Sequence, residues 1–211
     1  MLQELYELVK KGYGRSVTVG AFSTGIVGGG AGTILDLDQP EFTIGVPAGY
    51  ALIPLYVEIV VKGGVSTADG DETEALLAAD SLGLWTGDGT FTSENPSNLR
   101  TDLDKGAACR VGSAFTADMT TTPGNGGAAA DPVLDMELAR VVESADQGGT
   151  AANVAYRIIR LLYQPNYPPI LVGPSSLLGY WGGTIATVDG FAIVHWVEGP
   201  AREILPAIAG L

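Results

Sequence analysis

Residues 175–198 read SSLLGYWGGTIATVDGFAIVHWVE, and this stretch decides the fold. Two runs rich in β-forming residues flank Val188-Asp189-Gly190. An Asp-Gly pair between such runs is a strong hairpin signal, because a type I′ turn needs positive φ at both central residues. The sequence therefore predicts a β-hairpin that turns at Asp189-Gly190.

Alternate residues of the second arm point to opposite sides of the expected strand. One side carries Phe191, Ile193, His195 and Val197, and the other carries Ala192, Val194, Trp196 and Glu198. Both sides are largely apolar, which is typical of a strand covered on both faces. We expect this hairpin to lie at the centre of an all-β protein.

Similar β-rich runs occur along the rest of the chain. They predict strands over 16–22, 41–46, 50–62 and 109–119, and a second hairpin made of 133–143 and 151–163. The arms of this second hairpin also contain good helix formers, so two short helices are the alternative there. Short strands joined by long loops, without alternating helices, predict one β-sandwich domain over 1–211.

Both ends of the chain are apolar. Residues 1–12 are expected to form a helical arm, with leucines at helical spacing and a glycine stop at Gly12. This arm packs either on its own domain or on a neighbouring subunit, and the sequence leaves both possibilities open. Residues 199–211 form an apolar tail that must also be buried on one or the other.

Residues 63–104 are acidic and rich in glycine, and we interpret them as a long excursion with a possible short helix over 72–79. Within it, the acidic cluster at 69–74 comprises Asp69, Asp71, Glu72 and Glu74. These carboxylates are candidate Ca²⁺ ligands, but they lack the spacing of an EF-hand loop. A solvated acidic loop is the favoured interpretation.

Composition limits the partners. The formal net charge is −13 with 11 basic residues, which are scattered rather than clustered, so direct binding of DNA or RNA is not expected. No apolar run reaches the ~18 residues of a membrane span. The start of the chain lacks the features of a secretion signal, and we expect synthesis in a cytosol.

The chain contains few histidine and cysteine residues, which often act as catalytic bases or nucleophiles. His195 is the single histidine and Cys109 the single cysteine, and each is expected to pack in a strand. The glycine-rich stretch 24–33 matches neither G-x-G-x-x-G nor the P-loop. We therefore expect no enzyme, and we predict no catalytic residues, no cofactor and no metal site.

Charged residues make up 17% of the chain, against about 25% in typical soluble domains. A soluble monomer needs polar groups over its surface, so we expect part of this surface to be covered by other subunits.

The runs FTIGVPAGYALIPLYVEIVV (42–61) and YPPILVGPSSLLGYWGGTIATVDGFAIVHWVE (167–198), separated by a long excursion, resemble viral jelly-roll proteins, particularly bacteriophage virion components. The resemblance lies in the texture of strands and loops over residues 40–198 and includes no diagnostic motif. It implies a jelly-roll capsid subunit or a decoration or vertex protein that packs on copies of itself and on other shell proteins. By analogy we expect a trimer, located in the virion after synthesis in the host cytoplasm.

A carbohydrate-binding or carbohydrate-active β-sandwich is the alternative function. Aromatic side chains that stack on sugar rings must be exposed on a groove. The candidates are Trp85, Tyr180, Trp181 and Trp196, and Trp181, beside Gly182-Gly183, is the one expected to be exposed. Aromatic residues buried within or between subunits would favour the shell role instead.

Overall fold

The computed structural model describes residues 2–28, 35–63, 71–86, 91–103, 105–145, 157–184 and 188–209. Two helices, α1 (Leu2–Lys10) and α2 (Ala201–Ala209), carry the two ends of the chain. The strands are β1 (Gly14–Val19), β2 (Ile26–Val27), β3 (Phe42–Val46), β4 (Tyr50–Gly63), β5 (Asp71–Asp80), β6 (Gly83–Trp85), β7 (Thr92–Glu94), β8 (Ser97–Asn98), β9 (Arg110–Ser113), β10 (Thr121–Pro123), β11 (Met136–Ala145), β12 (Arg157–Tyr163), β13 (Leu171–Val172), β14 (Ser175–Gly183) and β15 (Val188–Pro200).

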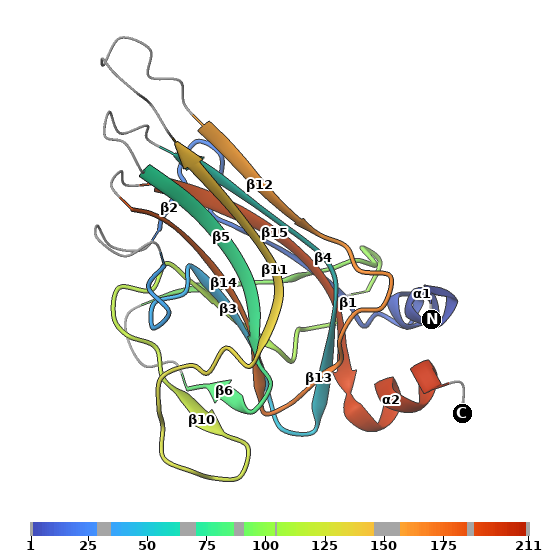
Figure 1. Cartoon of the computed structure of the whole chain (residues 1–211). Helices are drawn as coiled ribbons and strands as arrows, with labels where there is room; N and C mark the ends of the chain where they lie inside the picture. Colours follow the sequence, from blue (N-terminus) through green and yellow to red (C-terminus); the bar gives the residue numbers. More distant parts are fainter. Residues whose placement is uncertain are drawn as a thin grey trace.

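The strands form two large antiparallel sheets that face each other (Figure 1). Sheet A has the order β12-β4-β15-β1-β8, and β13 and β2 pair with β4 and β15 respectively. Sheet B has the order β11-β5-β14-β3-β9-β7. A small third sheet pairs β10 with β6.

Within the described ranges, eight strands have five residues or more, and they are paired in a nested order. The first of them pairs with the last (β1 with β15), the second with the seventh (β3 with β14), the third with the sixth (β4 with β12) and the fourth with the fifth (β5 with β11). Pairing of β15 with β4 and of β14 with β5 joins these ribbons into the two sheets. This is the jelly-roll arrangement, and the expected all-β sandwich is confirmed.

The main apolar core fills the space between the sheets. Its largest side chains include Phe42 from sheet B, Trp181 from β14 and Trp196 from β15. The rings of Phe42 and Trp181 lie 6.4 Å apart, tilted by 43°. Sheet packing of this kind buries one face of every long strand, which explains the alternating apolar pattern seen in the sequence.

The hairpin predicted at Asp189-Gly190 is wrong. β14 ends at Gly183 in sheet B, and β15 begins at Val188 in sheet A, so the two runs are in different sheets. Gly190 lies inside β15 and is not among the positive-φ glycines. A Cβ there would lie 2.9 Å from the carbonyl oxygen of Val60 and 3.0 Å from the Trp181 ring, so close packing, not a turn, requires this glycine.

The second predicted hairpin is also wrong. β11 pairs with β5 in sheet B and β12 pairs with β4 in sheet A, so the two arms are strands that do not share a sheet. The alternative of two helices is wrong as well. Residues 146–156, which would hold the turn between these arms, lie outside the described residues.

The excursion predicted over 63–104 contains a core strand. Residues 72–79 lie in β5, which pairs on both sides with β14 and β11, and the predicted short helix is wrong. The run is rich in Ala, Leu and Glu, which favour helices, but burial of both faces overrides that propensity and hides the alternation. The longest irregular region instead joins β5 to β11 and carries β6, β7, β8, β9 and β10.

The two helices pack side by side at one end of the sandwich (Figure 1). Leu5 and Leu8 of α1 and Ile204 of α2 form an apolar cluster with Ala51, Ile53 and Val197 of sheet A. The N-terminal arm therefore packs on its own domain. The expected apolar tail becomes α2, with Ile204 buried in the same cluster. In the ranges that the structure describes, no helix is long and apolar enough to cross a membrane.

Candidate functional site

His195 and Cys109 lie on opposite sides of sheet A. The His195 ring is on the outer side, 5.3 Å from the Tyr56 ring, and burial lowers its pKa below the usual value. The Cys109 thiol belongs to the core between the sheets, where burial and nearby Glu198 raise its pKa well above the usual value. A thiol held protonated and away from the imidazole does not act as a Cys-His nucleophile.

The acidic cluster at 69–74 is only partly described. Asp69 and the side chain of Asp71 lie outside the described residues. Glu74 is buried and forms an ion pair with Arg140 of β11, while burial raises its pKa more than this pair lowers it. Among the described residues, no group of three or more His, Cys, Asp or Glu side chains is arranged to hold a metal ion.

The four aromatic residues that the carbohydrate alternative needs are all buried. They are Trp85, Tyr180, Trp181 and Trp196. The predicted exposure of Trp181 is wrong, because its ring fills the core and its Nε1 donates a hydrogen bond to the carbonyl oxygen of Ile26 at 3.0 Å. These residues offer no exposed platform on which a sugar ring can stack.

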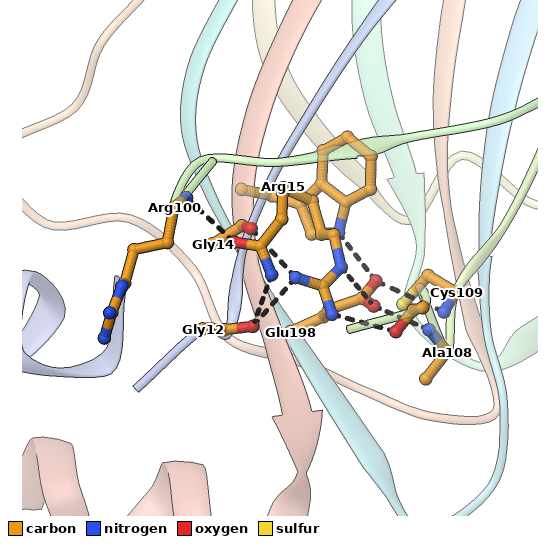
Figure 2. Close-up of polar contacts among 10 residues, drawn as sticks. Gly12, Gly14, Arg15, Arg100, Ala108, Cys109 and Glu198 are labelled. Atoms are coloured by element: carbon orange, nitrogen blue, oxygen red, sulfur yellow. Dashed lines mark hydrogen bonds and ion pairs between the residues drawn. The ribbon is translucent and has the colours of Figure 1, made fainter. Parts of the chain in front are cut away.

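Arg15 and Glu198 form a closed polar cluster, shown in Figure 2. Glu198 accepts hydrogen bonds from Arg15 Nε at 3.2 Å, from the Ala108 amide at 2.6 Å, from the Cys109 amide at 3.2 Å and from Trp196 Nε1 at 2.9 Å. The Arg15 guanidinium also donates to three backbone carbonyl oxygens, those of Gly12, Gly14 and Gly106.

This cluster is structural. It ties the segment 106–109 to the start of β1 and the end of β15, and both charged residues are only 1% exposed. A ligand has no access to either charge. The cluster was not predicted from the sequence, although a signal existed. Glu198 shares a strand face with Val194 and Trp196, and a carboxylate at a core-facing position needs a buried partner.

The two sheets differ in what covers their outer sides. The outer side of sheet B carries an apolar cluster in which Leu76, Leu178 and Tyr180 are covered by Trp85 and Phe115 from the region between β5 and β11. The three apolar clusters of the described residues lie between the sheets, over sheet B and beneath the two helices. None of these three clusters covers the outer side of sheet A beyond the helices.

We call this bare region the outer face of sheet A. Its side chains are the outward residues of four neighbouring strands: Ser16 and Thr18 of β1, Tyr56, Glu58, Val60 and Lys62 of β4, Ile158, Arg160 and Leu162 of β12, and Asp189, Phe191, Ile193 and His195 of β15. Two aliphatic side chains on β12 are well exposed, Ile158 at 56% and Leu162 at 52%. Phe22 is also exposed and lies edge-on to Phe191, with ring centroids 6.3 Å apart.

The charges of this face are paired with each other. Lys62 Nζ lies 3.0 Å from Asp189 Oδ1, and Arg160 Nε lies 2.6 Å from Glu58 Oε1. Tyr56 donates a hydrogen bond to Glu58 at 2.6 Å, and this bond and Arg160 lower the pKa of the Glu58 carboxyl. The face therefore carries two cations and two anions in a chain of net charge −13.

A groove of about 510 Å³ adjoins α1. Its lining is apolar or uncharged: Leu5, Tyr6, Val9, Leu55, Gln164, Pro165, Asn166 and Pro168. It lacks the convergent polar groups that orient a reacting ligand. Together with the outer face of sheet A, it gives this side of the molecule the character of a contact surface.

Comparison of the chain with protein-family models, with curated protein sequences and with solved structures finds no match.

Proposed function

We propose that this protein is a non-enzymatic structural subunit of a virus particle, either a capsid subunit or a capsid decoration or vertex protein. The observation that carries the proposal is the nested jelly-roll pairing of its eight long strands. Jelly rolls serve as capsid, lectin and cupin domains. The resemblance of residues 40–198 to virion components selects the first of these.

The surface supports a role in assembly. One sheet is covered by the chain's own long connection, while the outer face of sheet A combines exposed aliphatic residues with mutually paired charges. Apolar surface that is rimmed by polar groups and left open on a protein is typical of interaction sites. The partners that we propose are copies of this chain, with a trimer expected by analogy, and other shell proteins.

The charge favours a place away from the genome. At −13 the chain repels nucleic acid, and the 11 basic residues form no patch that offsets this. We propose that the protein is part of the outer shell of the virion, after synthesis in the host cytoplasm.

The test is the mass of the purified protein in solution, measured by light scattering over a concentration series and combined with negative-stain microscopy. We expect a defined oligomer or a shell-sized particle. A mass of one chain at every concentration, with no particles, would contradict a self-associating shell protein.

A further inference from the structure

The outer face of sheet A has a self-complementary arrangement of residues. Strands β4 and β15 are antiparallel neighbours, and their outward residues form cross-strand pairs. These pairs are Lys62 with Asp189, Val60 with Phe191, Glu58 with Ile193 and Tyr56 with His195. Each pair joins side chains that differ in charge, size or polarity.

Two copies that meet with these faces can be related by a two-fold axis. The axis lies between the copies, parallel to the strands and midway between β4 and β15, and it exchanges the members of each pair between the copies. Rotation about it places β4 of one copy over β15 of the other. Lys62 then faces Asp189 of the second copy, and Asp189 faces Lys62 of the second copy. The Val60 and Phe191 side chains meet in the same way.

We propose that the outer face of sheet A packs face to face on a second copy of this chain about this axis. Charge identifies the occupant. A chain of net charge −13 repels its copies, but this face holds equal numbers of cations and anions, and the two-fold axis places Lys62 of each copy opposite Asp189 of the other. The inference deepens the proposed function and rests on its premise that the chain self-associates.

The exposed side chains add apolar contact around the charge pairs. Phe22 lies at the end of the face that holds Lys62 and Phe191, and its carbonyl oxygen accepts a hydrogen bond from Lys62 at 2.5 Å. Ile158 and Leu162 extend the face along β12. Burying Phe22, Ile158 and Leu162 against a second copy removes three exposed apolar side chains from water.

The size of the face sets the strength of the contact. Four strands about 4.8 Å apart, each contributing about seven residues at 3.3 Å per residue, give a footprint on the order of 400 Å². A standard interface buries about 800 Å² per partner. The pair of copies is therefore weak in isolation. In a larger assembly the two-fold contact joins chains of different trimers, and simultaneous contacts of this kind strengthen it.

Reciprocal charge reversal tests the proposal. Lys62→Asp and Asp189→Lys each place like charges opposite one another twice in a symmetric pair, so each variant alone is expected to self-associate at least about 10-fold more weakly than the wild type. In a one-to-one mixture of the two variants, every such contact becomes complementary again. We expect the mixture to regain wild-type association, measured by sedimentation velocity over a concentration series.

Matched controls separate the face from general charge and folding effects. Lys11→Asp and Asp131→Lys change the net charge by the same amounts at exposed positions away from the face. Leu162→Ser removes apolar contact on the face, and Leu82→Ser does so elsewhere. Circular dichroism and thermal melting establish that each variant is folded.

The outcomes separate this inference from the proposed function. If the wild type self-associates and both charge reversals leave its association unchanged, the outer face of sheet A is not the contact, although the chain does self-associate. If each variant loses association and the mixture does not regain it, the two-fold pairing is overturned. If the wild type stays monomeric throughout, the premise shared with the proposed function fails.

Discussion

Arg15 Nε lies 3.2 Å from Glu198 Oε1, and this ion pair joins the first and the last long strands of the jelly roll. Both side chains are almost completely shielded from solvent. The pair sits where β1 and β15 are hydrogen-bonded, with Arg15 directly opposite Trp196. Transfer of a charge from water into the protein interior is costly, and the seven hydrogen bonds around this pair offset that cost.

Replacement of one partner of this pair should destabilise the fold strongly. Arg15→Met leaves the Glu198 carboxylate buried without its cation, and we expect a loss of about 3–5 kcal/mol in the free energy of unfolding. Urea denaturation measures it. The exposed ion pair of Lys10 with Glu7 provides the control, since water screens it and Lys10→Met should leave the stability nearly unchanged. Equal effects of the two substitutions would show that the buried pair is unimportant.

The single histidine gives a direct test of the environment of the outer face. Burial lowers the pKa of His195 below its usual value of 6.5. The folded state therefore binds the proton less readily than the unfolded state. The resulting stability is fully present above pH 6.5 and is lost as the pH falls from 6.5 through the folded pKa. Proton NMR titration of the only imidazole measures that pKa without ambiguity.

Tyr56→Ala is the informative variant for this titration. It removes the ring that lies against His195, so the imidazole becomes more hydrated and its pKa should rise towards 6.5. Tyr167→Ala, which changes a tyrosine exposed elsewhere, should leave the titration unchanged. A His195 pKa at or above 6.5 in the wild type would contradict the burial of this ring.

The sequence predicted most of the long strands well and their partners poorly, and the strand expected over 109–119 is confirmed only over Arg110–Ser113. Alternation over 41–46 and 50–62 located β3 and β4 to within a few residues. The observed strand partners differ from the predicted ones because a jelly roll pairs distant segments, such as Gly14 with Val197. Turn signals report only on segments that are neighbours in the sequence. Asp189-Gly190 satisfied the turn signal, but its glycine is required by the approach of Trp181 and Val60.

The remaining errors have the same origin. Residues 72–79 favour a helix locally, and only the position between β14 and β11 makes them a strand. The outer face of sheet A was not predicted, because its residues come from four strands spread over most of the chain. The low fraction of charged residues indicated that other subunits cover part of the surface, but it did not show which part.

The N-terminal helix should be required for stability. Leu8 is 1% exposed beneath α1, so Leu8→Ala should lower the free energy of unfolding by about 2–5 kcal/mol. Tyr6 is 60% exposed on the same helix, and Tyr6→Ala should change it by less than about 0.5 kcal/mol. Guanidinium denaturation compares the two. If α1 were an arm that only contacts a neighbour, both substitutions would leave the stability of the monomer unchanged.

Gly179 tests the packing between adjacent strands of sheet B. A Cβ at this position would lie 1.9 Å from Cε1 of Phe42 on the neighbouring strand β3, and both residues are buried among core side chains. The Trp181 ring packs against Phe42 in the core between the sheets, which restricts the movement of the Phe42 ring. Gly179→Ala should therefore destabilise the protein by at least about 1–3 kcal/mol through overpacking. Thermal denaturation measures the loss, and Gly106→Ala, where a Cβ meets no atom within 4 Å, is the matched control. Equal melting temperatures for the two alanine variants would mean that β14 and β3 are not packed as closely as described.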